Sequence, residues 1–291
     1  MRRRRLAAEL HRLRVAARLT LEEVADHLEC SPAKISRIEN GQVAVRIQDA
    51  RELLELYDVN DEQCQPLLAM VRQARGKGWW SDYADLLDEG GQTLLSLEDE
   101  ASSILIYETN LIAALLQTRR YAWELISSRT DSPLDLVQRG VDLRMARQQI
   151  LDRPNAPRLN VVLDEASLRR AVSSRDVMRE QYELLVDAAA RPNIGLRVLP
   201  FGAGAHQAMG FPFQIFEFVD DDPQLVSVEL LSRREIFESA EEVGRYRAAF
   251  NQVYERALAP EESRNFMMNL VKEYGQLTCV ALSARSQRRC S

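Results

Sequence analysis

The sequence predicts two domains of different class. Residues 1–75 read as a mainly α-helical domain with a helix–turn–helix, and residues 79–282 as an α+β domain with a small sheet of about four strands. Helical spacing of apolar residues fills the first part, and short strand-like runs appear only after residue 158. Two glycines within residues 76–78 predict a hinge, and residues 283–291 are expected to form a frayed tail.

A first helix is indicated near the N-terminus. Leu6, Leu10, Leu13 and Ala17 lie at spacings that put them on one helical face. The basic run Arg2–Arg5 before them has two readings that we leave open. It is an arm that contacts phosphate or a minor groove, or a solvated tail.

The stretch from Thr20 to Gly41 predicts two short helices joined by a tight turn. Thr20 and Glu23 have the T-x-x-E spacing of a capping box. Ser31 is a good cap for the second helix, and Pro32 suits its first position. Gly41 supplies the left-handed stop at its end. The second helix has the length and the small or cationic outward side chains that suit a DNA major groove.

The residue pattern within this stretch is more specific than a helical hairpin with a solvated charged face, which is the alternative reading. It resembles the Cro/repressor-like regulators called the XRE family. The matching residues are Leu21, Ala25, Ser31, Ile35, Ser36, Glu39 and Gly41. The resemblance implies binding of a double-stranded DNA operator.

Two groups of residues are expected to make the DNA contacts. Base contacts are expected from Ser31, Ala33, Lys34, Ser36 and Arg37 on the second helix. Phosphate contacts are expected at helix ends and connectors, from Arg18, Thr20, Asn40, Arg46 and Gln48. Because one such head reads few base pairs, a homodimer on a near-palindromic site is expected.

The charge distribution fits this division of labour. Residues 1–48 hold ten Arg or Lys against six acidic residues, a net charge of +4, whereas the whole chain carries −6. The remainder therefore carries −10. A basic N-terminal part and an acidic remainder are expected where one end of a protein binds phosphate and the other end does not.

The remaining elements follow from apolar spacing and turn residues. Two more helices, Gln48–Tyr57 and Asn60–Arg75, complete a five-helix domain. Further helices are predicted over Leu94–Leu116, Tyr121–Ser127, Pro133–Leu151, Glu165–Val172, Arg175–Ala190, Ser239–Leu258 and Pro260–Tyr274. Strands are predicted over Leu159–Leu163, Ile194–Leu199, Phe213–Phe218 and Leu225–Leu230, the last two as a hairpin.

Motifs along most of the chain carry a second resemblance. They lie at Gly78–Trp80, Leu115–Thr118 with Tyr121 and Ala122, Arg144–Leu151, Leu163–Glu165 with Leu168, Val198–His206, and Gly210 with Phe211. The order is similar to that of the actinomycete WhiJ-like developmental regulators. One departure is Ile112–Ala114, where those regulators commonly have proline-glycine. The resemblance implies a C-terminal domain of unassigned biochemistry, regulated by a small protein partner or a ligand.

An enzymatic reading rests on carboxylates near strands and on one histidine. Glu165, His206, Glu217 and Glu229 could support acid–base chemistry. No nucleophile stands at a recognised spacing, and Gly202–Gly204 lacks the lysine and serine of a phosphate loop. We therefore expect no enzyme and no cofactor. A ligand or partner pocket is a stronger hypothesis than catalysis, with Trp80, Gln117, Arg144, Glu165 and His206 as candidates. For each residue taken singly, tying the sheet to its helices stays the first interpretation.

The sequence also indicates the cellular compartment of the protein. Four scattered cysteines fit reduced thiols and not a disulfide framework or a metal site. No apolar run approaches the roughly 18–20 residues of a membrane span. The resulting expectation is a cytoplasmic transcription regulator whose body senses a ligand or binds a partner. The alternative is an antitoxin-like module that neutralises a neighbour-encoded small protein and autoregulates its operon.

Overall fold

The computed structural model describes residues 2–41, 43, 45–74, 78–128, 133–219 and 222–287. The chain divides into two compact units, Met1–Ser81 and Asp82–Ser291. Residues 76 and 77 of the expected hinge lie outside the described residues, so the hinge stays a prediction.

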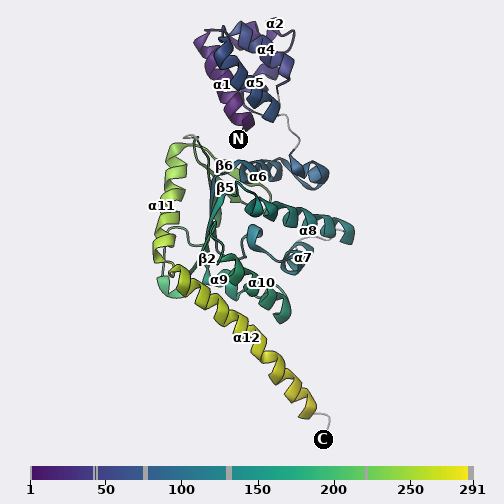
Figure 1. The fold of residues 1–291 in the computed structure, drawn as a ribbon, viewed down its shortest axis with the longest axis vertical. Coiled ribbons are helices and arrows are strands. Elements are labelled where there is room, and N and C mark those ends of the chain that lie inside the picture. The colour runs from purple at the N-terminus through teal and green to yellow at the C-terminus, as the bar shows by residue number, and fades with distance from the viewer. Residues whose placement is uncertain are drawn as a thin grey trace. The chain divides into compact units, whose positions relative to one another are not determined.

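The N-terminal unit is helical, as predicted, and its five α-helices pack around one core (Figure 1). They are α1 (Arg2–Ala16), α2 (Leu21–His27), α3 (Pro32–Glu39), α4 (Ile47–Leu56) and α5 (Asp61–Ala74). A 3₁₀ segment, η1 (Trp79–Leu86), begins in this unit. Leu6, Leu10 and Leu13 of the predicted stripe are buried in the core. Since α1 begins at Arg2, the backbone of the basic run is the first turn of this helix and not an extended arm.

The C-terminal unit contains one mixed sheet with helices on both faces (Figure 1). Its strands are β1 (Ser103–Glu108), β2 (Arg158–Asp164), β3 (Ile194–Leu199), β4 (Phe213–Glu217), β5 (Leu225–Glu229) and β6 (Arg234–Phe237). Its helical segments are α6 (Glu89–Glu100), η2 (Ala114–Leu116), α7 (Arg119–Ser128), α8 (Leu134–Gln148), η3 (Gln149–Asp152), α9 (Glu165–Arg169), α10 (Arg175–Ala188), η4 (Phe201–Ala203), α11 (Ala240–Arg256) and α12 (Pro260–Gln287).

The sheet has six strands in the order β3-β2-β1-β4-β5-β6, so the expectation of about four was wrong. β1, β2 and β3 run parallel, and β4, β5 and β6 add antiparallel pairings. The expected hairpin between β4 and β5 is present. The two strands that the sequence reading missed are β1, at the centre, and β6, at one edge.

β1 was predicted as part of a long helix because Ile104 and Tyr107 stand at helical spacing with later leucines. In the structure β1 lies between β2 and β4, and its four central residues are all buried. A strand that is covered on both faces shows a continuous apolar run in place of alternation. Such a run cannot be distinguished from a buried helix by periodicity alone.

β6 was missed for the opposite reason. It is an edge strand of four residues, Arg234–Phe237, all half-buried, and two of them are charged. Short charged strands are common at sheet edges because they discourage pairing with other chains. They have little apolar pattern for a sequence reading to detect.

The two sheet faces have different coverings. Tyr107 shares one face with Phe213, and this face packs against α11. Ile106 and its neighbour Gln214 point to the opposite face, since successive side chains of a strand alternate. Figure 1 shows α11 on the first face and α6, α7, α8 and α10 on the other.

The last helix is longer than predicted. α12 continues from Pro260 to Gln287, whereas the sequence reading ended it near Tyr274 and made residue 283 the start of a frayed tail. The helix packs along α10 and β3. Residues 288–291 lie outside the described residues.

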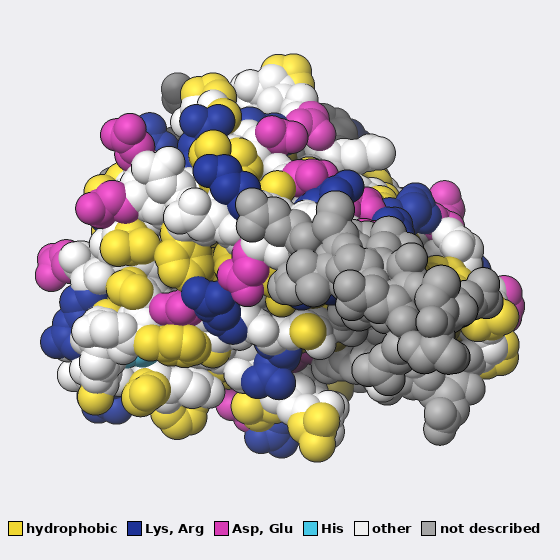
Figure 2. Space-filling model, turned by 90° about the horizontal axis from the view of Figure 1, so that it is seen from below, with side chains coloured by type: hydrophobic (Ala, Val, Ile, Leu, Met, Phe, Trp, Pro, Cys, Tyr) yellow, Lys and Arg dark blue, Asp and Glu magenta, His cyan; other side chains and the backbone are white. Residues whose placement is uncertain are grey.

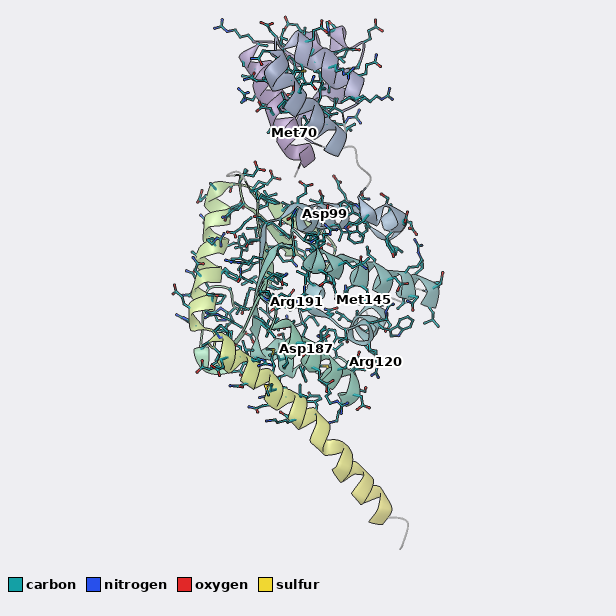
Figure 3. The ribbon with its side chains drawn as sticks, in the orientation of Figure 1. Met70, Asp99, Arg120, Met145, Asp187 and Arg191 are labelled. Atoms are coloured by element: carbon teal, nitrogen blue, oxygen red, sulfur yellow. The ribbon has the colours of Figure 1, made fainter. Side chains whose placement is uncertain are left out.

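Surface ion pairs join several of these elements. Arg120 of α7 pairs with Glu180 of α10 at 3.0 Å, and Arg191 pairs with Asp152 at 2.7 Å (Figure 3 labels both arginines). All four side chains are exposed, so each pair adds little stability. The covering helices are therefore held mainly by their buried apolar residues.

Candidate functional site

The helix–turn–helix of the N-terminal unit has the caps that the sequence predicts. The backbone N–H of Thr20 donates to Oε2 of Glu23 at 2.8 Å, and the N–H of Glu23 donates to Thr20 Oγ1 at 3.2 Å. At the start of α3, Ser31 Oγ accepts from the Lys34 N–H at 3.3 Å. Gly41 has φ of 69°, a left-handed backbone that ends the segment.

The outward face of α3 carries the expected recognition residues. Ile35 and Ile38 are buried in the core, which turns the opposite side of the helix to solvent. The five predicted base-contact residues fall into two groups, with Ser31, Ala33 and Arg37 exposed and Lys34 and Ser36 half-buried. Arg37 is thus the exposed cation of this face, and its Nε donates to the backbone carbonyl of Ala33 at 3.2 Å.

Lys34 has an acidic partner that the sequence reading did not foresee. Its Nζ lies 2.8 Å from Oδ2 of Asp49 on α4. The pair is only partly exposed, so it offsets much of the lysine charge in the free protein. Lys34 must therefore exchange or share this partner in order to reach a base edge.

Glu39, at the end of α3, is a structural residue of the site. Arg14 of α1 donates to both of its carboxylate oxygens, and His11 Nδ1 lies 2.7 Å from Oε2. Burial opposes ionisation of Glu39, but the hydrogen bonds from Arg14 and His11 outweigh it and lower the pKa of the carboxyl. The clamp holds α3 against α1, so it fixes the helix that carries Arg37.

The five residues expected to contact phosphate all have exposed side chains. Three lie at helix ends, with Thr20 as N-cap of α2, Asn40 as C-cap of α3 and Arg46 as N-cap of α4. Gln48 lies in the first turn of α4, and Arg18 has φ of 59° in the connection before α2. Helix N-termini present backbone N–H groups that favour phosphate. The contacts themselves stay a prediction.

Within the C-terminal unit, the structure does not bring Gln117 and Arg144 together with Glu165 and His206. Gln117 and Arg144 are joined by a hydrogen bond of 2.8 Å and line one cavity. Glu165 accepts from the Phe201 N–H at 3.0 Å and pairs with Arg169, so it ties α9 to η4 after β3. Trp80 belongs to the N-terminal unit.

His206 lies on another part of the sheet. Its Nε2 is 3.3 Å from the hydroxyl of Tyr107, and that hydroxyl donates to Oδ2 of Asp164 at 3.4 Å. Burial lowers the pKa of His206, although the Asp164 charge acts in the opposite direction. Tyr107 is also buried, and its pKa is raised. This cluster lies beside the α11 face, where Tyr107 packs.

The cavity that contains Gln117 and Arg144 has a volume of about 340 Å³. Its polar wall comes from the sheet and α8, with Glu108, Gln214, Ser227, Glu229, Arg234 and Arg144. A neighbouring cavity of about 420 Å³ lies beside α8 and α6 and shares Arg144, Glu229 and Arg234 with the first. The shared residues form a charged partition between the two cavities.

Charged and polar side chains of this partition act on one another. Arg234 donates to Ser227 Oγ at 3.0 Å and to Glu229 Oε2 at 2.6 Å. Burial and the nearby Glu229 carboxylate raise the pKa of Glu108 to about 8, although Arg234 and Arg144 oppose the shift. Glu108 is therefore a neutral carboxylic acid near pH 7 and can donate a hydrogen bond.

All three carboxylates behind the enzymatic reading have cationic partners, and that of Glu165 is Arg169. Glu217 pairs with Arg247 of α11, and Glu229 pairs with Arg234. Within the described residues, no three His, Cys, Asp or Glu side chains gather as a metal site would require. None of the described helices is long and apolar enough to cross a bilayer.

The sequence reading found Glu229 but missed its partners. Arg234 and Glu108 were overlooked because β6 and β1 were not recognised as strands. Asp49 and Arg14 were visible only as ordinary helix charges. On the face of the molecule in Figure 2, basic and acidic side chains are interspersed among hydrophobic ones, so no single-sign field stands out among its coloured residues.

Comparisons with known proteins address both units. A family model described as a helix-turn-helix domain matches residues 5–67. A second, described as a domain of unknown function (DUF5753), matches residues 92–269, which is more than half of the chain. No curated protein and no solved structure matches the chain significantly. The helix-turn-helix match indicates a DNA-binding regulator.

Proposed function

From the premise that the chain belongs to the DUF5753 family and carries an N-terminal helix-turn-helix domain, we propose that it is a sequence-specific transcription regulator. The N-terminal unit binds a double-stranded DNA operator in the cytoplasm. The C-terminal unit receives a signal, a small ligand or a protein partner. The resemblance to XRE-type and WhiJ-like regulators supports this division.

One observation carries the DNA-binding proposal. Arg37 is exposed on the solvent side of α3, while Ile35 and Ile38 bury the opposite side and Glu39 clamps the helix end to α1. A guanidinium held on a rigid helix can donate two hydrogen bonds to guanine in the major groove. The proposal therefore assigns base reading to α3 and names Arg37 as its main contact.

The test is selection of bound sequences from random duplex DNA, followed by fluorescence anisotropy on the selected site. Arg37→Ala should weaken binding by about 1–3 kcal/mol and relax preference at one base position. Unchanged affinity and preference in this variant would refute the assignment. Arg12→Ala is the matched control, because Arg12 is an exposed α1 arginine paired with Glu9. It should keep the base preference.

We further propose a homodimer on a near-palindromic operator. A single head covers few base pairs, and two-fold symmetry in the protein is mirrored in such sites. The signal is proposed to change the spacing of the heads through residues 76–78. Native mass spectrometry of protein from its own host tests the stoichiometry. A monomer with and without DNA would reject the dimer.

A second candidate function is an antitoxin-like module that neutralises a neighbour-encoded small protein. The loop between β3 and β4 favours it, because Phe201, Met209 and Phe211 there are each more than 60% exposed. Exposed apolar clusters commonly mark protein contacts. In the same mass spectra, an added mass of several kilodaltons would favour this reading, and one of a few hundred daltons would favour a ligand.

A further inference from the structure

We propose that the cavity between the sheet and α8 binds a small organic acid, a monocarboxylate with an apolar body and one hydroxyl or N–H donor. The inference deepens the proposed function, since it names the ligand class that the C-terminal unit would sense. Whether the acid binds can be measured without DNA. The binding site and its regulatory role are therefore separately testable.

The dimensions and wall of the cavity fit such a molecule. Its volume of about 340 Å³ lies in the usual range for small-molecule sites. Apolar residues line much of the rest, namely Leu111, Ile112, Leu125, Pro212 and Leu230. The polar groups lie together on the strands and α8. A wall divided in this way suits a ligand with one polar end.

The charges of the polar wall select an anion. Arg144 and Arg234 contribute two positive charges, and Glu229 contributes one negative charge. Glu108 adds none near pH 7, because its pKa is about 8. One positive charge is left in excess, and a monocarboxylate would balance it. An uncharged ligand would leave it uncompensated in a partly desolvated wall.

Arg234 is built to receive the carboxylate. Its contacts with Ser227 and Glu229 hold the guanidinium in place. An arginine carries five N–H donors in a planar fork, so it can keep both contacts and still donate to a ligand. Its side chain is only 13% exposed, so a charge-assisted hydrogen bond there would be stronger than one in open water.

Gln214 indicates that the ligand carries a hydrogen-bond donor. Its Oε1 is buried and accepts no hydrogen bond from any described residue, although Gln214 lines the cavity. A buried acceptor without a partner carries a free-energy cost, which a ligand donor removes if the Gln214 amide turns into the cavity. A carboxylate cannot supply that donor, but a hydroxyl or N–H on the same molecule can. The carboxylate and the hydroxyl or N–H donor together define the proposed class of ligand.

The experiment is isothermal titration calorimetry of the full chain with three probes: 4-hydroxyphenylacetate, its primary amide, and phenylacetate. The amide lacks the charge and phenylacetate lacks the donor. The hydroxy acid should bind roughly tenfold or more tighter than the amide. It should also bind more tightly than phenylacetate. Equal affinity for acid and amide, or no binding of any probe at millimolar concentration, would overturn the proposal.

Variants of the cavity wall then test which residue binds the carboxylate. Arg234→Gln should remove the preference for acid over amide. Arg233→Gln is the matched control, since Arg233 is the adjacent arginine, is exposed and pairs with Glu235. Thermal melts establish that each variant is folded. Persistence of the full acid preference in Arg234→Gln would contradict the assignment.

Steric variants distinguish the two cavities without touching a charge. Ala114 lines only the smaller cavity and Gly140 only the larger one. A Cβ at Gly140 would lie 3.6 Å from Ile126, which is ordinary contact, so a Cβ fits at this position. Ala114→Leu should abolish binding of the hydroxy acid, and Gly140→Leu should retain it. The reverse result would overturn the choice of cavity.

The dependence on pH adds an independent readout. Glu229, Arg234 and Arg144 are the charged groups that act on Glu108. As pH rises through about 8, ionisation of Glu108 cancels the excess positive charge. Affinity for the acid should then fall by roughly tenfold. Glu108→Gln should bind with little pH dependence, and an identical decline in that variant would contradict the charge argument.

Operator binding is measured in the same protein with and without the hydroxy acid. If the acid binds but operator affinity does not change, the cavity assignment holds and its sensing role fails. If no operator is selected at all, the DNA-binding proposal fails whatever the calorimetry gives.

Discussion

Arg14 on α1 donates two hydrogen bonds to Glu39 on α3, from Nε to Oε1 at 2.7 Å and from an Nη to Oε2 at 2.9 Å. Both side chains are largely buried, with 11% and 6% of their surfaces exposed. The two residues are far apart in sequence but lie at the contact of the first helix with the recognition helix. This ion pair determines how rigidly α3 is presented.

Glu39→Gln should lower the free energy of unfolding of the N-terminal unit by about 3 kcal/mol, because removing one partner leaves a buried guanidinium without its counter-charge. Urea denaturation followed by circular dichroism measures the change. Glu9→Gln is the matched control, since Glu9 pairs with Arg12 on the exposed side of α1. It should change stability by less than about 0.5 kcal/mol. A similar loss in both variants would contradict the clamp.

The stability of the C-terminal unit should fall as pH rises from about 4.5 to 8. Glu108 has a raised pKa of about 8 in the fold against 4.5 for a free side chain. The folded state therefore retains a proton that the unfolded chain releases over this range, which favours unfolding by an amount on the order of 4 kcal/mol. In thermal melts, the stability of Glu108→Gln should lack this part of the pH dependence. A variant with the wild-type pH slope would rule out Glu108 as its source.

Glu29→Gly should stabilise the N-terminal unit by about 0.5–1 kcal/mol. Glu29 lies in the turn between α2 and α3 with φ of 49°, a left-handed conformation that glycine adopts without a Cβ penalty. Glu22→Gly is the control for the loss of an acidic residue, because Glu22 is helical in α2. It should destabilise the unit. Equal signs of the two effects, measured by chemical denaturation, would contradict the strain argument.

Asp49→Asn should increase affinity for the selected operator severalfold at low salt. Lys34 is held by Asp49 at 2.8 Å in the free protein, so removing the carboxylate releases the ammonium for DNA. The slope of log K against log salt should steepen by about one unit. Glu55→Gln on the same helix is the control, since Glu55 is an exposed acidic residue of α4. An unchanged salt slope in Asp49→Asn would indicate that Lys34 does not meet DNA.

Most of the C-terminal helices and four strands were predictable, because each has a local signal. Ser239 caps α11 through the Glu242 N–H, as the sequence spacing indicates. β1 and β6 had no such signal, since one is buried on both faces and the other is a short edge strand. The proposed cavity depends on both, so it could not be found from the sequence.

Within the C-terminal unit, Gln117 and Arg144 do not group with Glu165 and His206 for a related reason. Sequence order shows which residues end strands but not which face of the sheet their side chains enter. Glu108 and Tyr107 are adjacent in β1 and yet point to opposite faces, one into the cavity and the other towards α11. Two residues that are neighbours in the sequence therefore belong to different clusters on opposite faces of the sheet.

The sequence by itself determined the helix–turn–helix, because caps, helical periodicity and the stop at Gly41 are local signals that act within a few residues. It also determined which side chains of α3 face solvent. Only the tertiary structure decided that Glu39 clamps α1, that Asp49 holds Lys34, and that Glu108 and Arg234 meet in one wall. These relationships depend on burial and on strand order, which arise when distant segments pack together and remove charges from water.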